Sequence, residues 1–157
     1  MANNVIESYK RILGGSRSIL LIDWPDQRVP RSLLKAGLIV FGFSPNYYSI
    51  AKFESEGVQN KEGNAVFPPH NESESLNLVF TKIENPPDHI DIVNIYRPEE
   101  EHASIITNHV LPLNAKVIWL QPPITSVKTR NLAKEYGITF IEAVDIADIA
   151  RDIIPIS

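Results

Sequence analysis

The chain has 157 residues, 43% of them hydrophobic and 22% charged, which is the length and composition of one globular domain. Its formal net charge of −4, without a dense block of Lys and Arg, argues against nucleic acid or an anionic membrane as a partner. Because the sequence contains no cysteine, disulfides, thiolate metal sites and a cysteine nucleophile are excluded.

The N-terminal residues carry acidic and amide side chains where a signal peptide needs an apolar core. No apolar run approaches membrane-spanning length, so we expect a cytoplasmic location. Apolar residues at helical spacing, followed by Gly14-Gly15 as a stop signal, predict a helix over Val5–Leu13.

The next segments predict alternating strands and helices. Ser18–Asp23 has the composition of a buried strand and is followed by the loop Trp24–Pro30 and a short helix that ends at Gly37. Leu38–Phe43 is the second predicted strand, and Ser44-Pro45-Asn46 after it is typical of a turn.

The pattern changes between Tyr48 and Asn77, where polar stretches surround Val66-Phe67-Pro68-Pro69. This composition predicts a polar surface insertion at about residues 50–76 with little or marginal structure, and it makes Glu54–Ser75 the most mobile internal segment. Apolar residues within or beside it, Val66 and Phe67 among them, predict a surface for self-association or for a protein partner. Leu78–Ile83 then reads as a short edge strand.

The clearest signal is a strand, helix, strand unit over Asp88–Gln121. Ile90–Tyr96 and Lys116–Leu120 are short, β-branched and apolar, as strands covered on both faces are. Pro98 and the three glutamates after it suit the start of the helix between them. This unit predicts an α/β fold with a doubly wound, mostly parallel sheet of five or six strands.

The C-terminal part continues the alternation. Thr125 is the predicted cap of a helix that reaches Tyr136, and a last strand, Ile138–Ile141, precedes a last helix, Ile146–Ile153. Asp145 lies near the start of that helix, where the helix dipole favours a carboxylate.

Familiar catalytic and nucleotide-binding motifs are missing from the sequence. The loop after Asp23 has no glycine where a pyrophosphate would approach the backbone, and there is no P-loop. His102 and His109 are seven residues apart on the predicted helix, about 10 Å along its axis, which is too far for one metal ion without a third element. We expect both to be solvated helix positions and Trp119 to be core. No metal site and no catalytic residue is predicted.

Three runs carry a resemblance to a known family: Asp91-Ile-Val-Asn-Ile-Tyr-Arg-Pro, Ala115-Lys-Val-Ile-Trp-Leu-Gln and Ala133-Lys-Glu-Tyr-Gly-Ile-Thr-Phe-Ile. They resemble the small CoA-binding domain family, which is related to the nucleotide-binding half of succinyl-CoA synthetase α chains. The resemblance implies a single Rossmann-like domain over residues 1–157, with CoA lying across the strand ends.

By position, the resemblance implies cofactor-binding residues in four strand-end loops: Trp24, Pro25 and Arg28; Ser44 and Pro45; Arg97 and Pro98; and Gln121. Pro25, Pro122 and Pro123 stand where backbone donors or glycine are usual in the family, so we expect weak binding. Arg97 has an alternative role, because Glu100 and Glu101 lie one helical turn away and could pair with it.

Two functions follow. The first is a small-molecule binding module for CoA, an acyl-CoA or another adenine nucleotide, without catalysis of its own. The alternative is a degenerate Rossmann-like domain that has lost the ligand and acts in protein–protein interaction. Acyl-CoA or phosphohistidine enzymology would need a second domain or partner chain.

Overall fold

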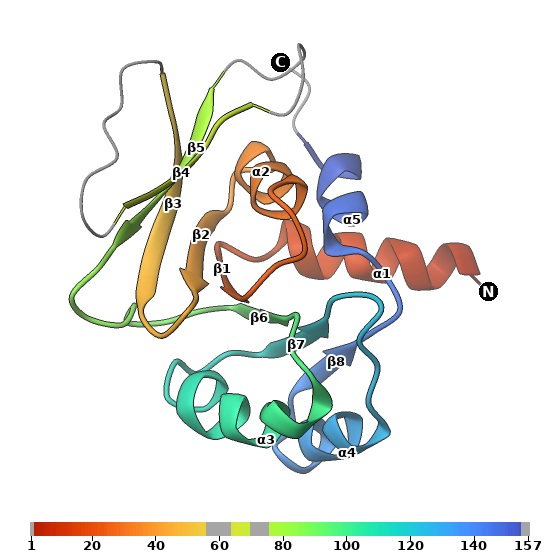
Figure 1. Ribbon diagram of the computed structural model, residues 1–157. Coiled ribbons are helices and arrows are strands. Elements are labelled where there is room, and N and C mark those ends of the chain that lie inside the picture. The colour runs from red at the N-terminus through yellow and green to blue at the C-terminus, as the bar shows by residue number, and fades with distance from the viewer. Residues whose placement is uncertain (1, 56–63, 70–75, 155–157) are drawn as a thin grey trace.

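The computed structural model describes residues 2–55, 64–69 and 76–154, which form a layered α/β structure (Figure 1). The helices are α1 (Ala2–Gly14), α2 (Arg28–Lys35), α3 (His102–Ile105), α4 (Val127–Glu135) and α5 (Ile146–Asp152). A 3₁₀ turn, η1 (Glu99–Glu101), precedes α3, and a π-helical turn, η2 (Ile106–Val110), follows it. The strands are β1 (Ser18–Ile22), β2 (Ile39–Phe43), β3 (Tyr48–Glu54), β4 (Asn64–Phe67), β5 (Asn77–Lys82), β6 (Ile92–Ile95), β7 (Val117–Leu120) and β8 (Thr139–Ile141).

The strands form a single sheet in the order β4-β5-β3-β2-β1-β6-β7-β8. The five strands from β2 to β8 in that order are parallel, and β3, β5 and β4 extend the sheet antiparallel beyond β2. The predicted α/β class with a mostly parallel sheet is therefore confirmed. The predicted count of five or six strands is wrong, because the sheet has eight.

The extra strands come from the segment in which little structure was expected. β3 and β4 lie within residues 48–67, and β3 alternates its faces, with Ser49 and Ala51 buried between more exposed neighbours. β5 is not an edge strand, since it pairs with β3 on one side and β4 on the other. The apolar runs in this polar segment are each too short to indicate a strand in the sequence. They form strands in the structure because pairing with neighbouring strands buries them. The predicted mobile segment lies mostly in residues 56–63 and 70–75, outside the described residues.

Helices cover both faces of the parallel strands (Figure 1). One face packs against α1, α2 and α5 in a core that includes Leu13, Leu33 and Ile149. The other face packs against α3, η2 and α4 through residues such as Ile106 and Ala133. Trp119 is fully buried, as predicted, and its indole Nε1 donates to the Val144 carbonyl at 2.9 Å.

The helix starts follow local capping chemistry. Ser126, not the predicted Thr125, caps α4, because its hydroxyl accepts from the Thr129 N–H at 3.0 Å. Asp145 caps α5 and accepts from the Ala147 N–H at 2.9 Å, which agrees with its predicted place at that helix start. No helix in the described part of the chain is long and apolar enough to cross a membrane.

The two histidines of the central segment are not solvated as predicted. His102 is 1% exposed, with Nδ1 2.7 Å from the Thr129 hydroxyl and Nε2 2.8 Å from the Arg97 carbonyl oxygen. His109 is 9% exposed. His109 lies in the π-helical turn η2 and is buried against Tyr48 and Phe43, two residues from strands that the local sequence did not place beside it.

The order in which the chain adds parallel strands to the sheet reverses between β1 and β6, and this reversal positions the candidate functional site. The connection from β1 to β2 passes through α2 on one face, and the connection from β6 to β7 passes through α3 on the other. β1 and β6 are neighbours, so the two connections leave in opposite directions from adjacent strand ends. A crevice forms at such a switch point, where open α/β sheets commonly bind ligands.

Candidate functional site

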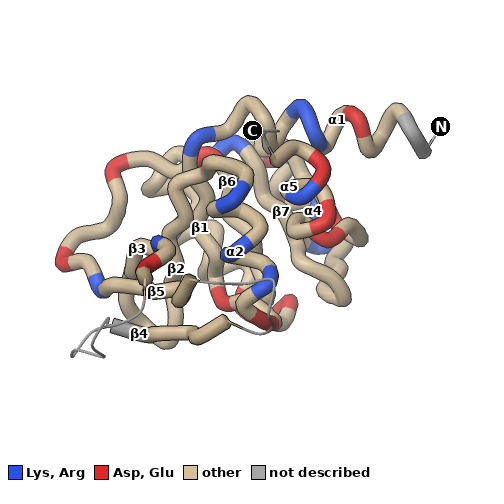
Figure 2. Tube along the Cα trace, turned by 90° about the horizontal axis from the view of Figure 1, so that it is seen from above, with Lys and Arg blue, Asp and Glu red and all other residues tan. Residues whose placement is uncertain are grey.

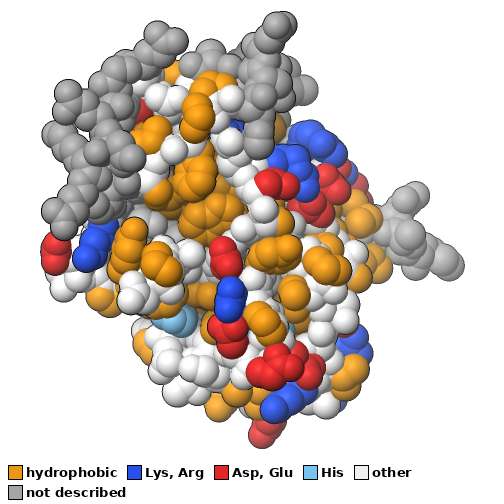
Figure 3. All heavy atoms as spheres, viewed as in Figure 1, with side chains coloured by type: hydrophobic (Ala, Val, Ile, Leu, Met, Phe, Trp, Pro, Cys, Tyr) orange, Lys and Arg blue, Asp and Glu red, His pale blue; other side chains and the backbone are white. Residues whose placement is uncertain are grey.

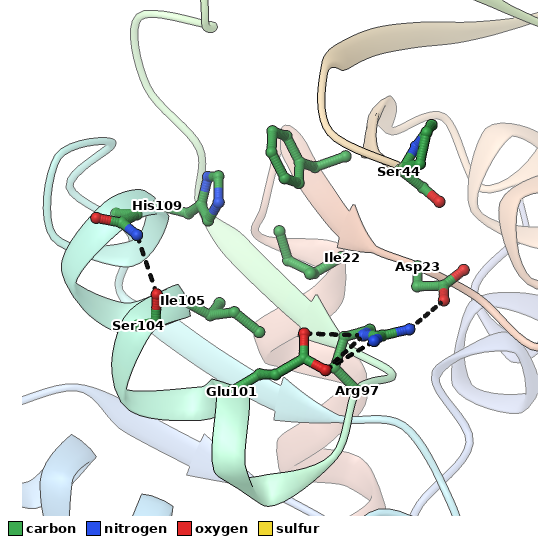
Figure 4. A pocket seen from close by; sticks show the side chains of 11 residues that line it. Ile22, Asp23, Ser44, Arg97, Glu101, Ser104, Ile105 and His109 are labelled. Atoms are coloured by element: carbon green, nitrogen blue, oxygen red, sulfur yellow. Dashed lines mark hydrogen bonds and ion pairs between the residues drawn. The ribbon is translucent and has the colours of Figure 1, made fainter.

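A pocket of about 510 Å³ opens at this switch point, on the carboxyl side of β1, β2 and β6 (Figure 4). Its volume lies in the range of small-molecule sites. The lining combines apolar, neutral polar and charged side chains: Ile22, Asp23, Phe43, Ser44, Pro45, Arg97, Glu101, Ser104, Ile105, Asn108 and His109. Figure 3 shows hydrophobic side chains over much of the face seen in Figure 1, with charged groups near its centre.

Arg97 follows β6 and lies between two carboxylates. Its Nε and Nη2 donate to the Glu101 carboxylate at 3.1 and 2.7 Å, and its Nη1 donates to Asp23 Oδ2 at 3.2 Å (Figure 4). The pairing with Glu101 confirms one of the two ion pairs that the sequence offered. The hydrogen bonds from Arg97 lower the pKa of Glu101, so the carboxylate is charged at neutral pH.

The backbone conformation of Asp23 and a hydrogen bond to its side chain fix the carboxylate beside Arg97. Asp23 has a φ of 64°, a left-handed conformation that is uncommon outside glycine and more accessible to Asp and Asn than to most residues. Its Oδ1 accepts from the Trp24 N–H at 2.9 Å, which leaves Oδ2 facing Arg97. Asp23 is therefore fixed at the end of β1 by two contacts.

His109 closes the opposite side of the pocket. Its Nδ1 is 2.5 Å from the Tyr48 hydroxyl, and its ring lies 4.4 Å from that of Phe43. Burial lowers the pKa of His109 and raises the pKa of Tyr48, so the imidazole is neutral and the phenol keeps its proton. The two groups share a hydrogen bond between two neutral partners, the Tyr48 hydroxyl and the His109 Nδ1.

The loop after β1 uses its own donors internally. The Trp24 N–H is taken by Asp23, the Arg28 N–H donates to Asp26 Oδ1 at 2.9 Å, and Pro25 has no N–H. The Trp24 ring stacks on Phe80 with ring centres 4.6 Å apart, which directs it toward the antiparallel extension of the sheet. The amides of Trp24 and Arg28 are therefore not free to cradle a phosphate.

Arg28 and Gln121 belong to a different polar network. Arg28 pairs with Asp145 and Asp148 of the α5 start, with shortest distances of 2.5 and 3.4 Å. Figure 2 shows that basic and acidic positions are interspersed along the described trace. Gln121 is 1% exposed, and its Nε2 donates to Asp145 Oδ1 at 2.7 Å.

This network continues into the sheet. Gln121 Oε1 accepts from the Asn94 amide and from the Ile146 N–H, both at 3.3 Å. Among the described residues, Asn94 Oδ1 is a buried side-chain atom without a hydrogen-bond partner. Burial alone would raise the pKa of Asp145, but hydrogen bonds from Arg28 and Gln121 outweigh it and lower that pKa. Gln121 is thus oriented toward the core side of the sheet.

The structure brings together three of the eight predicted site residues. Ser44, Pro45 and Arg97 line the pocket, whereas the remaining five lie outside its lining: Trp24, Pro25, Arg28, Pro98 and Gln121. Sequence reasoning missed the contributions of Asp23, Glu101 and His109. The signal for the first two was present, because Asp23 ends a predicted strand and Glu101 lies four residues after Arg97; nothing in the sequence placed His109 near the end of β2.

A family model described as CoA binding domain matches residues 38–147. No curated protein is significantly similar to the sequence. Solved structures share its fold. A protein from Thermus thermophilus has 18% identity and a TM-score of 0.60, with 94% of this chain and 98% of that chain covered. A hypothetical protein from Pyrococcus horikoshii OT3 has 16% identity and a TM-score of 0.61 over 96% and 92%. Prb, a protein redesigned for binding, has 18% identity and a TM-score of 0.63 over 97% and 94%.

Proposed function

Because the chain belongs to the CoA-binding domain family, we propose that it binds CoA, an acyl-CoA or another adenine nucleotide in the strand-end pocket, without catalysis of its own. The observation that carries the proposal is the position of Arg97 in a pocket of ligand size at the switch point between β1 and β6. A guanidinium there matches a phosphate group, which it binds with two parallel hydrogen bonds.

The pocket residues fit such a ligand in part. Three features suit a nucleotide with a phosphate group: the volume of the pocket, its apolar lining around Ile22, Phe43 and Ile105, and the Arg97 guanidinium. The loop after β1 does not suit a phosphate, because Trp24 and Arg28 donate their backbone N–H groups within the loop. We therefore assign the phosphate contact to Arg97, with Ser44 after β2 as a further polar group of the same lining, and none to Trp24 or Arg28.

The absence of catalysis is proposed from the hydrogen bonds of the lining residues. The His109 Nδ1 is engaged by Tyr48, and the Ser104 hydroxyl accepts from the Asn108 amide at 3.0 Å. Within the described lining, no serine–histidine hydrogen bond is seen that would activate a nucleophile. This arrangement favours a binding site over a catalytic site.

Titration calorimetry with CoA, ADP and ATP tests the proposal on wild type, Arg97→Ala and Arg28→Ala. The two substitutions remove the same charge from neighbouring loops, but only Arg97 lines the pocket. We expect Arg97→Ala to weaken CoA binding at least tenfold, since a hydrogen bond to a charged group contributes about 1.5 to 3 kcal/mol. Arg28→Ala should stay within about threefold of wild type.

Two outcomes would count against the proposal. If both arginine variants bind CoA as wild type does, the site is elsewhere. If no nucleotide binds at millimolar concentration, the ligand-free interaction domain becomes the better account of the chain. In that case light scattering and co-purification would be the next measurements, because the interaction hypothesis predicts a stable complex with a second copy or another protein.

A further inference from the structure

Two carboxylates already accept hydrogen bonds from the Arg97 guanidinium in this structure. Glu101 occupies the edge formed by Nε and Nη2, and Asp23 accepts from Nη1 on the other side. A phosphate that binds a guanidinium with two parallel hydrogen bonds needs one whole edge. An anion can therefore take the edge formed by Nε and Nη2 only if the Glu101 carboxylate leaves it.

The charge of the group also opposes an anion. Arg97 contributes one positive charge, whereas Asp23 and Glu101 contribute two negative charges, and both carboxylates line the same pocket. The neutral His109 does not change this sum. A phosphate would meet a net negative site unless one carboxylate moves away, since like charges at close range repel.

The two carboxylates differ in their freedom to move. Asp23 is held by its left-handed backbone and by the Trp24 N–H that its Oδ1 accepts. Glu101 ends the three-residue turn η1, and its side chain is 44% exposed, with its carboxylate held in the described structure by Arg97. Glu101 is thus the partner that can rotate into solvent, and Asp23 is the one that keeps Arg97 oriented.

We propose that Glu101 is a gate on the anion site: its carboxylate holds Arg97 in the ligand-free chain, and a phosphate group of the ligand displaces it while Asp23 keeps the guanidinium in place. This inference rests on the proposed function, because it assigns Arg97 to the ligand. It adds a specificity determinant to the pocket. Glu101 sets a threshold that a weakly bound small anion does not pass and a ligand with further contacts in the pocket does.

The exposure of the Arg97 and Glu101 side chains sets the free energy needed to displace Glu101. The Arg97 and Glu101 side chains are 40% and 44% exposed, and ion pairs in such positions contribute little, on the order of 0.2 to 1 kcal/mol. Removal of the Glu101 charge should therefore tighten anion binding by about 1.4- to fivefold, the same energy expressed as a ratio of dissociation constants.

The test compares Glu101→Gln with Glu100→Gln in titration calorimetry with CoA. Both substitutions are isosteric and remove one negative charge, and Glu100 is an exposed residue of the same turn outside the pocket lining. The change in net charge is therefore the same in the two variants, and the difference reports the removal of the Glu101 carboxylate from Arg97 and the pocket. We expect Glu101→Gln to bind CoA about 1.4- to fivefold more tightly than Glu100→Gln.

A second readout is independent of CoA. Titration with inorganic diphosphate should show binding to Glu101→Gln that is tighter than binding to Glu100→Gln, and the Arg97 Nε–H signal in ¹⁵N NMR should exchange faster with water once the carboxylate no longer holds it. Equal affinities of the two variants for both probes, or weaker binding by Glu101→Gln, would overturn the gate. Diphosphate binding that is tightened in Glu101→Gln, without CoA binding by any variant, would keep the gate and reject the proposed function.

Discussion

Replacement of Gln121 by methionine separates a structural role from a ligand-binding role for this residue. Methionine has a similar length, so Gln121→Met removes the amide hydrogen bonds and leaves no large cavity. The change strands two buried donors, the Asn94 amide and the Ile146 N–H, which both donate to Gln121 Oε1. Asp145 also loses the hydrogen bond from Gln121 Nε2.

The magnitude follows from the number of donors left unpaired. A buried donor without a partner costs about 1 to 3 kcal/mol, so the two together should lower the free energy of unfolding by about 2 to 6 kcal/mol. For a chain of this length, each kcal/mol lowers the melting temperature by roughly 2 to 4 °C. A loss of about 3 kcal/mol would therefore lower it by roughly 6 to 12 °C.

Urea unfolding followed by tryptophan fluorescence measures this loss, because Trp119 is fully buried and reports the core. Lys116→Met is the matched control, since it places the same new side chain at an exposed position just before the same strand and should change stability by less than about 0.5 kcal/mol. A Gln121→Met protein as stable as the control, but with weakened CoA binding, would refute the network and support the ligand contact that the sequence predicted.

Three further predictions follow from the capping, burial and packing of single residues. Ser126→Ala should lower the free energy of unfolding by about 0.5 to 2 kcal/mol because it removes the α4 cap, whereas Thr125→Ala should have almost no effect; equal losses in urea unfolding would contradict the assignment of the cap. Burial lowers the pKa of His109 below 6.5, so the unfolded chain takes up this proton first and stability should fall as pH falls below 6.5. His109→Gln should remove that component of the pH dependence, and an NMR titration that places the pKa of His109 above 6.5 would contradict it. A Cβ at Gly42 would lie 3.1 Å from the Trp24 ring, so Gly42→Ala should cost about 1 to 3 kcal/mol and alter tryptophan fluorescence, and an unchanged spectrum would show that the ring has room to move.

Much of the fold could be predicted from local patterns. The strands around Leu20, Val93 and Ile118 were recognisable because a strand buried on both faces must be apolar throughout, whatever its neighbours are. The place of the strand-end pocket could be predicted as well, since the order of strands and helices puts the switch point between β1 and β6. Arg97 was predicted for the same reason, as the residue that leaves β6 at this edge.

The other site assignments depended on directions that local sequence does not encode. Trp24, Arg28 and Gln121 are at strand ends, as predicted, but their side chains contact Phe80, Asp145 and Asn94 instead of the pocket. These partners lie between 27 and 117 residues away in the sequence, so only the packed fold selects them. His109 reaches the pocket for a similar reason, through its contact with Tyr48.

By itself, the sequence determined the parallel α/β core, its helices and the family resemblance, because apolar periodicity and strand-end residues act over a few neighbouring positions. The tertiary structure alone decided that β3, β5 and β4 extend the sheet, that Gln121 supports the core, and that Asp23 and Glu101 share Arg97. Each of these outcomes rests on pairing between distant segments. A hydrogen-bonding or charged side chain has several partners available in sequence, and the one it takes is the one that the fold brings within reach.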